Sequence, residues 1–555
     1  MRAIVITFMC LISLLSSVVY ASVDAPLGNE MGSEIETPPF NTEIQNLLTE
    51  MTRVKLNKVI PVLKALEEQA AAESVLDQML PMFNTMLNGE LYYVKKTKQL
   101  VAIRKIEGEK KHFSVFKQEL ITSLPKKATK KIRVNNKVRR FLRETISRLQ
   151  LSAGDPESRE KAVISLLSEL DDSTIATLKE LKETEENQAV LEIMAVAIAM
   201  HTLEHNQDAA QRLEAVTALS GRLEREVHNL LVKVEIAEED LHVKKAITKS
   251  LKLIDQQISN YEFVDKVFFG LSLGSVLFLA AIGLAITFGV MGVINMAHGE
   301  MIMLGAYTTY VVQMLLPNAI EYSLWLAIPL AFLVSGSMGV LIERLVIRHL
   351  HGRPLETLLA TFGISLILQQ LVRTVFSPLN RQVESPTWMS GTLDINPVLS
   401  LTLNRLYILA FAFLVFGLLM LILNKTSLGL NVRAVAQNRN MAKAMGIRTD
   451  RVDAITFGLG SGVAGMAGVA LSQLTNVGPN LGQSYIIDSF MVVVFGGVGN
   501  LWGTLVAGFS LGLANKFIEP ITGAVLASIL VLVFIILFIQ KRPKGLFPQK
   551  GRAAE

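Results

Sequence analysis

The sequence predicts an all-α protein in two parts. A polytopic membrane helix bundle of about eight to ten spans, some of them re-entrant, follows an exported and mainly helical domain. Half of the 555 residues are hydrophobic and only 19% are charged, which is too apolar for a purely soluble protein. The charged, helix-like sequence lies almost entirely before Tyr261, and the long apolar runs lie after it. We therefore expect a signal peptide at 1–21, an extracytoplasmic domain at 22–260 and a membrane domain at 261–555.

Residues 1–21 have the pattern of a signal peptide. Arg2 precedes a continuous apolar run, and the segment ends in Val19-Tyr20-Ala21, which suits cleavage by signal peptidase. The single cysteine, Cys10, lies inside this segment. The exported domain is therefore expected to fold without disulfides, by helix packing alone.

The exported domain is expected to be mainly helical with a small β insert. Residues 40–80 alternate apolar and polar positions at the helical period, whereas 87–117 contain short alternating runs such as LYYVKK and QLVAIRK that suit strands. Farther on, the pattern D-x₃-R-x₂-A-V-x₂-L beginning at Asp155 recurs 53 residues later at Asp208, and it resembles HEAT-type helical repeats. The repeat predicts either a concave surface for a partner or a solvated spacer.

The membrane domain contains apolar stretches of two lengths. Those long enough to cross a bilayer lie at 267–290, 323–346, 355–376, 405–423, 452–474 and 521–539, and the shorter ones lie at 301–316, 485–498 and 501–517. With the N-terminal domain outside, nine crossings place the basic segments 348–354 and 425–451 and the C-terminal tail inside. The positive-inside rule requires the same arrangement.

Segment 425–451 is a basic stretch between two apolar spans, with six basic residues and one acid, Asp450. Its apolar residues recur at helical spacing, which predicts a short amphipathic helix that ends at Gly446. It is either a loop that sets the membrane topology or a docking helix for a cytoplasmic partner. The candidate contact residues of such a docking helix are Arg433, Val435, Gln437, Arg439, Ala442, Met445 and Gly446.

Polar groups and helix breaks within the apolar spans indicate a solute pathway. His298 and Glu300 beside the break at 295–299 either lie in this pathway or cap a helix break at the cytoplasmic interface. A polar stripe at i, i+4 and i+8 either lines the pathway or bonds to a neighbouring helix. The glycine-rich break at 495–500 is expected to expose backbone groups. The candidate pathway residues are Asn295, His298, Thr361, Ser365, Gln369, Gly496 and Gly497.

One predicted span is unusually rich in glycine. Missing side chains let membrane helices pack backbone to backbone, so this span is expected to pack closely against its neighbours in a bundle built around a narrow path. Its glycines are Gly458, Gly460, Gly462, Gly465 and Gly468.

Three separated stretches resemble the branched-chain amino-acid/urea group of ABC-transporter permeases. They are GLSLGSVLFLAAIGLAITFGVMGVINMAHGE at 270–300, RAVAQNRNMAKAMGI at 433–447 and VVFGGVGNLWGTLVAG at 493–508. The sequences of residues 295–300, of residues 499–503 and of the tail RPKGLFPQKGR are most similar to the urea-transporter branch. The long exported extension, including KIRVNNKVRRFL at 131–142, also resembles one found on members of that branch.

The resemblance implies an importer in the bacterial inner membrane. In such importers a periplasmic binding protein delivers the solute, two permease chains form the path, and two cytoplasmic ATPases act through short coupling helices. It assigns the coupling role to 433–446 and implies urea or a short amide as the solute. The alternatives are import of branched-chain amino acids and a passive channel.

The sequence lacks the features of an enzyme. No G-x-x-x-x-G-K-[ST] phosphate loop occurs, so ATP hydrolysis is expected on a separate subunit. We expect no cofactor, no metal site and no nucleic-acid partner, and we expect a lipid bilayer around the membrane domain.

Overall fold

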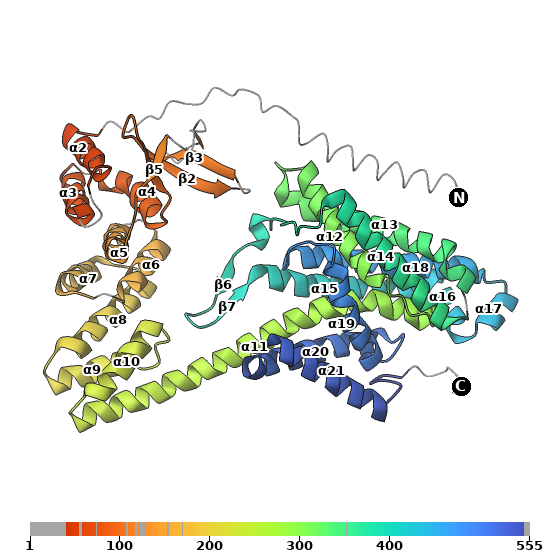
Figure 1. Cartoon of the computed structure of the whole chain (residues 1–555). Helices are drawn as coiled ribbons and strands as arrows, with labels where there is room; N and C mark the ends of the chain where they lie inside the picture. The colour runs from red at the N-terminus through yellow and green to blue at the C-terminus, as the bar shows by residue number, and fades with distance from the viewer. Residues whose placement is uncertain are drawn as a thin grey trace. The chain divides into compact units, whose positions relative to one another are not determined.

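The computed structural model describes residues 40–548 apart from 55–57, 74, 107–108, 117–119, 122–127, 152–154, 169 and 351. The predicted signal peptide at 1–21 lies outside the described residues. The chain divides into two compact units, Met1–Gln256 and Gln257–Glu555 (Figure 1). The predicted boundary at 260/261 falls within one continuous helix, α11 (Leu241–Met291), which contributes to both units.

The first unit begins with three helices and a small antiparallel sheet. The helices are α2 (Thr42–Met51), α3 (Val59–Ala72) and α4 (Leu76–Leu87). The strands are β1 (Leu91–Val94), β2 (Leu100–Ile106), β3 (Glu109–Ser114), β4 (Leu120–Ile121) and β5 (Thr129–Lys131), in the order β4-β3-β2-β1-β5. Ile44, Leu63 and Phe83 share one core with Leu91 of the sheet and Leu142 of α5 (Asn136–Gln150). The predicted β insert is confirmed, and it continues farther along the chain than the sequence pattern indicated.

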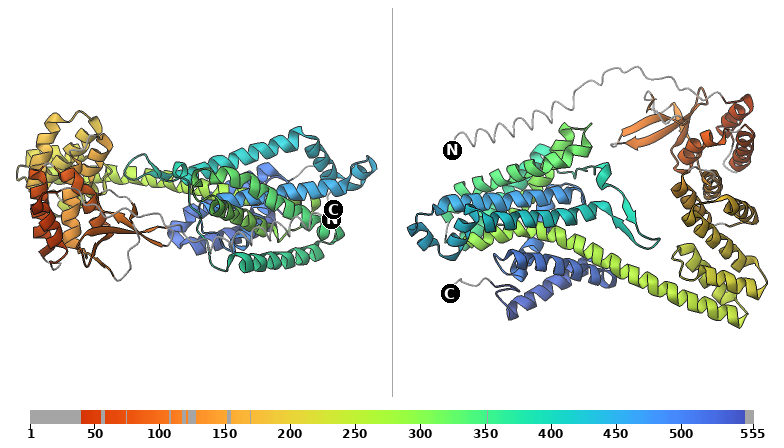
Figure 2. Two further views of the ribbon diagram at one scale, coloured as in Figure 1. Left: turned by 90° about the horizontal axis from the view of Figure 1, so that it is seen from above. Right: turned by 180° about the vertical axis from the view of Figure 1, so that it is seen from behind.

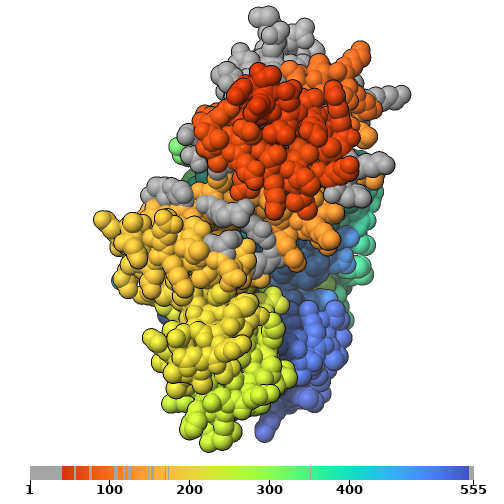
Figure 3. Space-filling view, turned by 90° about the vertical axis from the view of Figure 1, so that its left-hand side faces the viewer, coloured from red at the N-terminus to blue at the C-terminus, as the bar shows by residue number. Residues whose placement is uncertain are grey.

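The second part of this unit is a series of helices, coloured from orange to yellow-green in the space-filling view (Figure 3). They are α6 (Pro156–Leu166), α7 (Asp172–Thr184), α8 (Gln188–His205), α9 (Ala209–Leu219) and α10 (Arg225–Ala237), followed by α11. Asp155 caps α6 by accepting the N–H of Ser158, and Asp208 caps α9 by accepting that of Ala210. An aspartate at a helix N-terminus satisfies N–H groups that have no partner within the helix.

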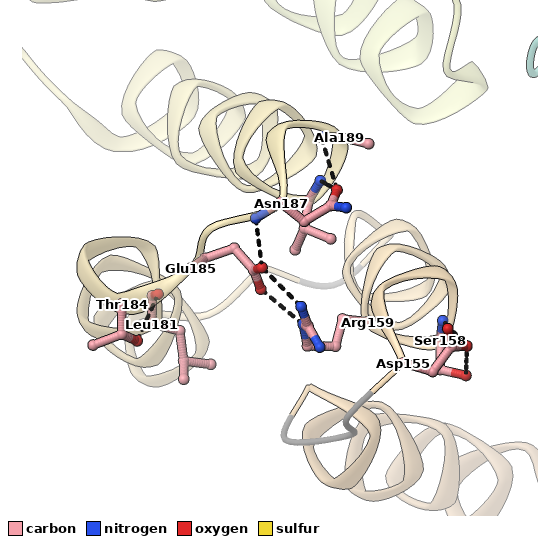
Figure 4. Close-up of polar contacts among 9 residues, drawn as sticks. Asp155, Ser158, Arg159, Leu181, Thr184, Glu185, Asn187 and Ala189 are labelled. Atoms are coloured by element: carbon pink, nitrogen blue, oxygen red, sulfur yellow. Dashed lines mark hydrogen bonds and ion pairs between the residues drawn. The ribbon is translucent and has the colours of Figure 1, made fainter.

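The sequence repeat is also a repeat of contacts. Arg159 forms an ion pair with Glu185 at 2.8 Å, and 53 residues later Arg212 pairs with Glu238 at 2.8 Å. Each glutamate also accepts a backbone N–H two residues ahead, from Asn187 in the first copy (Figure 4) and from Asp240 in the second. The arginine of one helix thus fixes the turn between the next two helices in both copies.

The second unit is a helix bundle. Its helices are the C-terminal part of α11, α12 (His298–Leu315), α13 (Ile320–Leu345), α14 (Pro354–Phe376), α15 (Leu403–Lys425), α16 (Ser427–Gln437), α17 (Arg439–Ala444), α18 (Thr449–Ser472), α19 (Leu481–Gly496), α20 (Leu501–Thr522) and α21 (Ala524–Lys541). It also contains the short helices η2 (Ile347–Leu350) and η3 (Thr387–Met389) and the hairpin β6 (Thr392–Asp394) and β7 (Ser400–Thr402). Among the described residues, seven helices are long and apolar enough to cross a membrane: α11, α13, α14, α15, α18, α20 and α21. Together with α12 and α19, they account for every apolar stretch predicted from the sequence.

Helix α18 is the central helix of this bundle, and most of it is buried (Figure 2). Its glycines meet backbone on three neighbouring helices, namely Gly283 of α11, Gly305 of α12 and Gly336 of α13. A Cβ atom on Gly305 would lie only 2.0 Å from the carbonyl oxygen of Gly465. Only glycine permits this separation of the backbones, so the predicted role of the glycine-rich span is confirmed.

Candidate functional site

Helix α12 begins inside the bundle. Residues 292–297 leave the end of α11, with Gly292 at φ +67°, and lead to His298. The same turn of α11 meets both His298 and Gly460 in the middle of α18, because both lie against Gly283. His298 is fully buried and Glu300 is 1% exposed. Both side chains therefore lie in the first turn of α12, after the break, and are enclosed by neighbouring helices.

Glu300 is the centre of a buried polar cluster. Its Oε1 accepts hydrogen bonds from Ser365 Oγ and Gln369 Nε2, each at 2.8 Å. One turn earlier on α14, Thr361 Oγ1 accepts the N–H of Met296 at 3.1 Å. The polar stripe on α14 therefore faces the break and the first turn of α12. We define the Glu300 cluster as Asn295, Glu300, Thr361, Ser365 and Gln369, each at most 6% exposed.

The Glu300 cluster retains unused hydrogen-bonding capacity. Asn295 Oδ1 accepts the N–H of Ala297 at 3.0 Å, which leaves its Nδ2 donor without a partner among the described residues. Glu300 Oε2 is an acceptor without a partner in the same part of the chain. His298 bonds to the carbonyl of Ala280 through Nε2 at 2.9 Å, and its Nδ1 has no described partner. Buried polar groups are usually satisfied, so these atoms require an explanation.

The sequence interpretation weighed Glu300 as a pathway residue but did not include it among the final candidates, yet Glu300 joins the stripe to the helix break. Spacing alone could not show this, because Glu300 is 65 residues from Ser365. The available signal was its type, since an ionisable residue within an apolar span is by default a functional candidate.

The break at Gly496-Gly497 contacts the C-terminal tail. The carbonyl of Gly496 accepts the N–H of Phe547 at 3.1 Å, and the N–H of Gly497 donates to Val493 at 3.0 Å. Gly497 and Gly545 lie so close that a Cβ on Gly545 would be 2.7 Å from Gly497. The C-terminal tail therefore takes the carbonyl of Gly496, and α19 itself takes the N–H of Gly497. Both groups have hydrogen-bond partners within the protein, and a role for Gly496 and Gly497 in a solute path stays a prediction.

Segment 425–451 forms two helices where one was predicted. Between α16 and α17, Asn438 adopts an extended conformation, and its Oδ1 accepts the N–H of Met441 at 2.9 Å. Asparagine competes with helical backbone bonding in this way and favours a helix start. Gly446, at φ +85°, ends α17. The N–H of Gly446 donates to the carbonyl of Lys443, and the N–H of Ile447 donates to the carbonyl of Ala442. This is the expected glycine stop.

The predicted docking face of this segment is divided between two environments. Val435 and Ala442 are buried with Val432 and Val452 in one apolar cluster, so they hold the segment to the bundle. Met445 is 77% exposed. Helical periodicity defines an apolar face but does not show which partner covers it, and here the bundle covers most of it. The exposed apolar residues of this segment, which we call the outer surface, are Leu430, Met441 and Met445.

The basic and polar candidates of the segment are also divided. Arg433 bonds to the carbonyl of Leu423, and Gln437 is exposed. Arg439 is directed inward and pairs with Asp453 of α18. Among the described residues, no group of His, Cys, Asp and Glu is arranged to hold a metal ion.

Comparison with known proteins identifies the second unit. The family model "Branched-chain amino acid transport system / permease component" matches residues 266–539. The high-affinity branched-chain amino acid transport system permease protein LivH of Salmonella typhimurium is 30% identical over 296 residues, which are 51% of this chain and 95% of LivH. The chain belongs to the branched-chain amino acid transport permease family. No solved structure matches it.

Other relatives of this chain do not all carry the same solute in their names. The corresponding protein BraD of Pseudomonas aeruginosa is 29% identical, over 52% of this chain and 96% of BraD. The ribose import permease protein RbsC of Escherichia coli is 24% identical, over 49% of this chain and 83% of RbsC. Family membership therefore establishes a transport permease and leaves the solute to be argued from the site.

Proposed function

We propose that this chain is the membrane permease subunit of an ATP-driven importer in the bacterial inner membrane. A second permease chain completes the path, a periplasmic binding protein delivers the solute, and separate ATPase subunits bind at the outer surface of α16 and α17. Leu430, Met441 and Met445 support this, because three exposed apolar side chains among basic residues suit a protein groove better than water. The coupling residues are then those of 433–446, with Met445 at the contact.

We assign urea, or a short amide, as the solute and the Glu300 cluster as part of its path. The observation that carries this assignment is the pair of unused atoms: Asn295 Nδ2 is a donor and Glu300 Oε2 is an acceptor. Urea has one carbonyl acceptor and N–H donors, so it can satisfy both atoms without bringing a charge into the bundle. Thr361, Ser365 and Gln369 hold the cluster in place through neutral hydrogen bonds.

Branched-chain amino acids are the second candidate solutes. The names of LivH and BraD favour them. In addition, Arg373 lies one turn beyond Gln369 on α14, close enough for its charge to attract the Glu300 carboxylate. Arg373 and Glu300 thus offer a cation and an anion, which suit the carboxylate and the ammonium group of an amino acid. However, Arg373 also donates to Asn480 at 2.7 Å, and its surroundings are exposed.

The test is uptake by the complete transporter reconstituted in vesicles, with labelled urea and labelled leucine assayed side by side, with and without ATP. Urea uptake that requires ATP supports the proposal. Leucine uptake without urea uptake assigns the second candidate. Urea entry that is equal with and without ATP identifies a passive channel instead.

A further inference from the structure

We infer that Arg439 and Asp453 form the mechanical link through which the cytoplasmic segment moves the bundle. The inference rests on the proposed function, because it requires an ATPase that acts on α16 and α17. Both residues then have positioning roles. Neither residue contacts the solute, and Asp453 does not contact the ATPase either.

The contact itself is a partly buried ion pair between α17 and α18. The two terminal guanidinium nitrogens of Arg439 donate to the carboxylate of Asp453. The side chain of Asp453 is 3% exposed and that of Arg439 is 25% exposed. Removing one partner from a buried pair leaves an uncompensated charge, which is far more costly than losing an exposed pair. Arg439 therefore cannot leave Asp453 without a replacement cation.

A second acid makes this requirement stronger. Glu343 of α13 is 1% exposed, and its Oε2 has no partner among the described residues. It lies close enough to Asp453 for the two charges to repel, with Arg344, Arg348 and Asp450 also acting on it. If Arg439 were withdrawn, two acids on adjoining helices would face each other inside the bundle. The pair therefore resists separation when α17 is displaced.

Helix α18 can carry a displacement from this pair to the Glu300 cluster. Gly465 and Gly468 follow Asp453 by 12 and 15 residues, so they lie about 18–23 Å along the helix axis. They meet Gly305 and the carbonyl of Ile302 on α12, and Ile302 lies just beyond Glu300. Contacts between backbones leave no flexible side chain to absorb a movement. A shift of α18 therefore acts on the first turns of α12.

A second ion pair at the same end of α18 provides a matched control. Arg348 follows α13 in η2 and pairs with Asp450 at 2.6 Å, and the two side chains are 52% and 53% exposed. This pair lies outside α17, and exposed pairs contribute little to stability. Substituting either residue of this pair removes a charge of the same sign from the same region and leaves the pair of Arg439 and Asp453 intact.

The experiment measures solute taken up per ATP hydrolysed by the complete transporter in vesicles. The variants are Arg439→Gln, Asp453→Asn and the charge exchange that combines Arg439→Asp with Asp453→Arg. The controls are Arg348→Gln and Asp450→Asn. We expect each single change at the link to lower the ratio by about two- to thirtyfold, the size of long-range coupling effects, while the subunits still assemble. The charge exchange should restore most of the ratio, and the controls should lower it less than any single change at the link.

Unchanged ratios in Arg439→Gln and Asp453→Asn would overturn the link, as would an equal loss in the controls. If Asp453→Asn does not insert, Arg439→Gln decides the question, because its side chain is partly exposed. A wild-type transporter that shows no ATP-dependent uptake of any solute would refute the proposed function and with it the link. An active wild type with unaffected variants would refute the link alone.

Discussion

Gln369 of α14 donates a hydrogen bond of 2.8 Å to Glu300 in the first turn of α12. Ser365 donates to the same oxygen, so two residues of one helix face fix a buried carboxylate that is 65 or more positions away. This arrangement holds Oε1 and leaves Oε2 for another donor. We propose the solute as this donor, and the first prediction follows from that proposal.

Replacement of Glu300 by glutamine should lower ATP-dependent urea uptake by about tenfold or more, because an unmatched buried polar group costs about 1–3 kcal/mol. Gln369→Leu should have a smaller effect, since Ser365 still holds the carboxylate. Initial uptake rates of labelled urea in vesicles measure both changes. Gln370→Leu is a suitable control, because this exposed residue is next to Gln369 and lies outside the cluster. Normal urea uptake by Glu300→Gln would exclude the cluster from the path.

The outer surface should be the contact for the ATPase. Met445→Asp places a charge in an apolar contact and should lower transport by about a hundredfold or more without preventing insertion. Met445→Leu should remain active. By contrast, Ala442→Asp should lower the amount of folded protein, since Ala442 is buried against the bundle. Transport and the yield of monodisperse protein, measured together, separate the two effects. If Met445→Asp transports as well as the wild type, Met445 is not part of the contact with the ATPase.

The glycine contact between α12 and α18 should tolerate no side chain. In Gly305→Ala the new methyl group would lie 2.0 Å from the carbonyl oxygen of Gly465, and we expect a loss of about 1–3 kcal/mol in stability. Gly363→Ala on α14 is the matched control, because no atom beyond the adjoining backbone of its own helix lies within 4 Å of its Cβ position. That change should be neutral or should stabilise by up to about 1 kcal/mol. Thermal unfolding in detergent distinguishes them, and equal stability of the two variants would contradict the packing argument.

The first unit should lose local stability in acid through Glu185. The hydrogen bond from Arg159, together with the N–H of Asn187, lowers the pKa of Glu185 below its ordinary value of 4.5. Because the folded-state pKa is the lower one, its stabilising contribution is complete above pH 4.5 and is lost as the pH falls through the folded value. Amide exchange in α6–α8, corrected for intrinsic rates, should therefore rise in acid. Glu185→Gln should weaken that dependence, whereas Glu183→Gln on an exposed face should keep it.

The two ends of α11 should lie on opposite sides of the membrane. A protease added to right-side-out spheroplasts should cut within 22–260 and spare 425–451, because the leader pattern and the positive-inside rule both require this sidedness. Inverted vesicles should show the reverse pattern. Cleavage of 425–451 from outside would overturn the proposed topology.

The helical class, the apolar spans and the close backbone packing of the glycine-rich helix could be predicted from the sequence, because these features follow from local periodicity and from side-chain size. The sequence also located a contact repeat, since Asp155 and Asp208 act within their own helices. Contacts between distant segments were decided only by the tertiary structure. Periodicity could not show that Glu300 joins the stripe on α14, that the tail closes Gly496-Gly497, or that the bundle covers Val435 and Ala442 while Met445 remains exposed. Each of these depends on which surfaces meet after folding, and a buried hydrogen bond or an apolar contact forms between whichever groups the packing brings together.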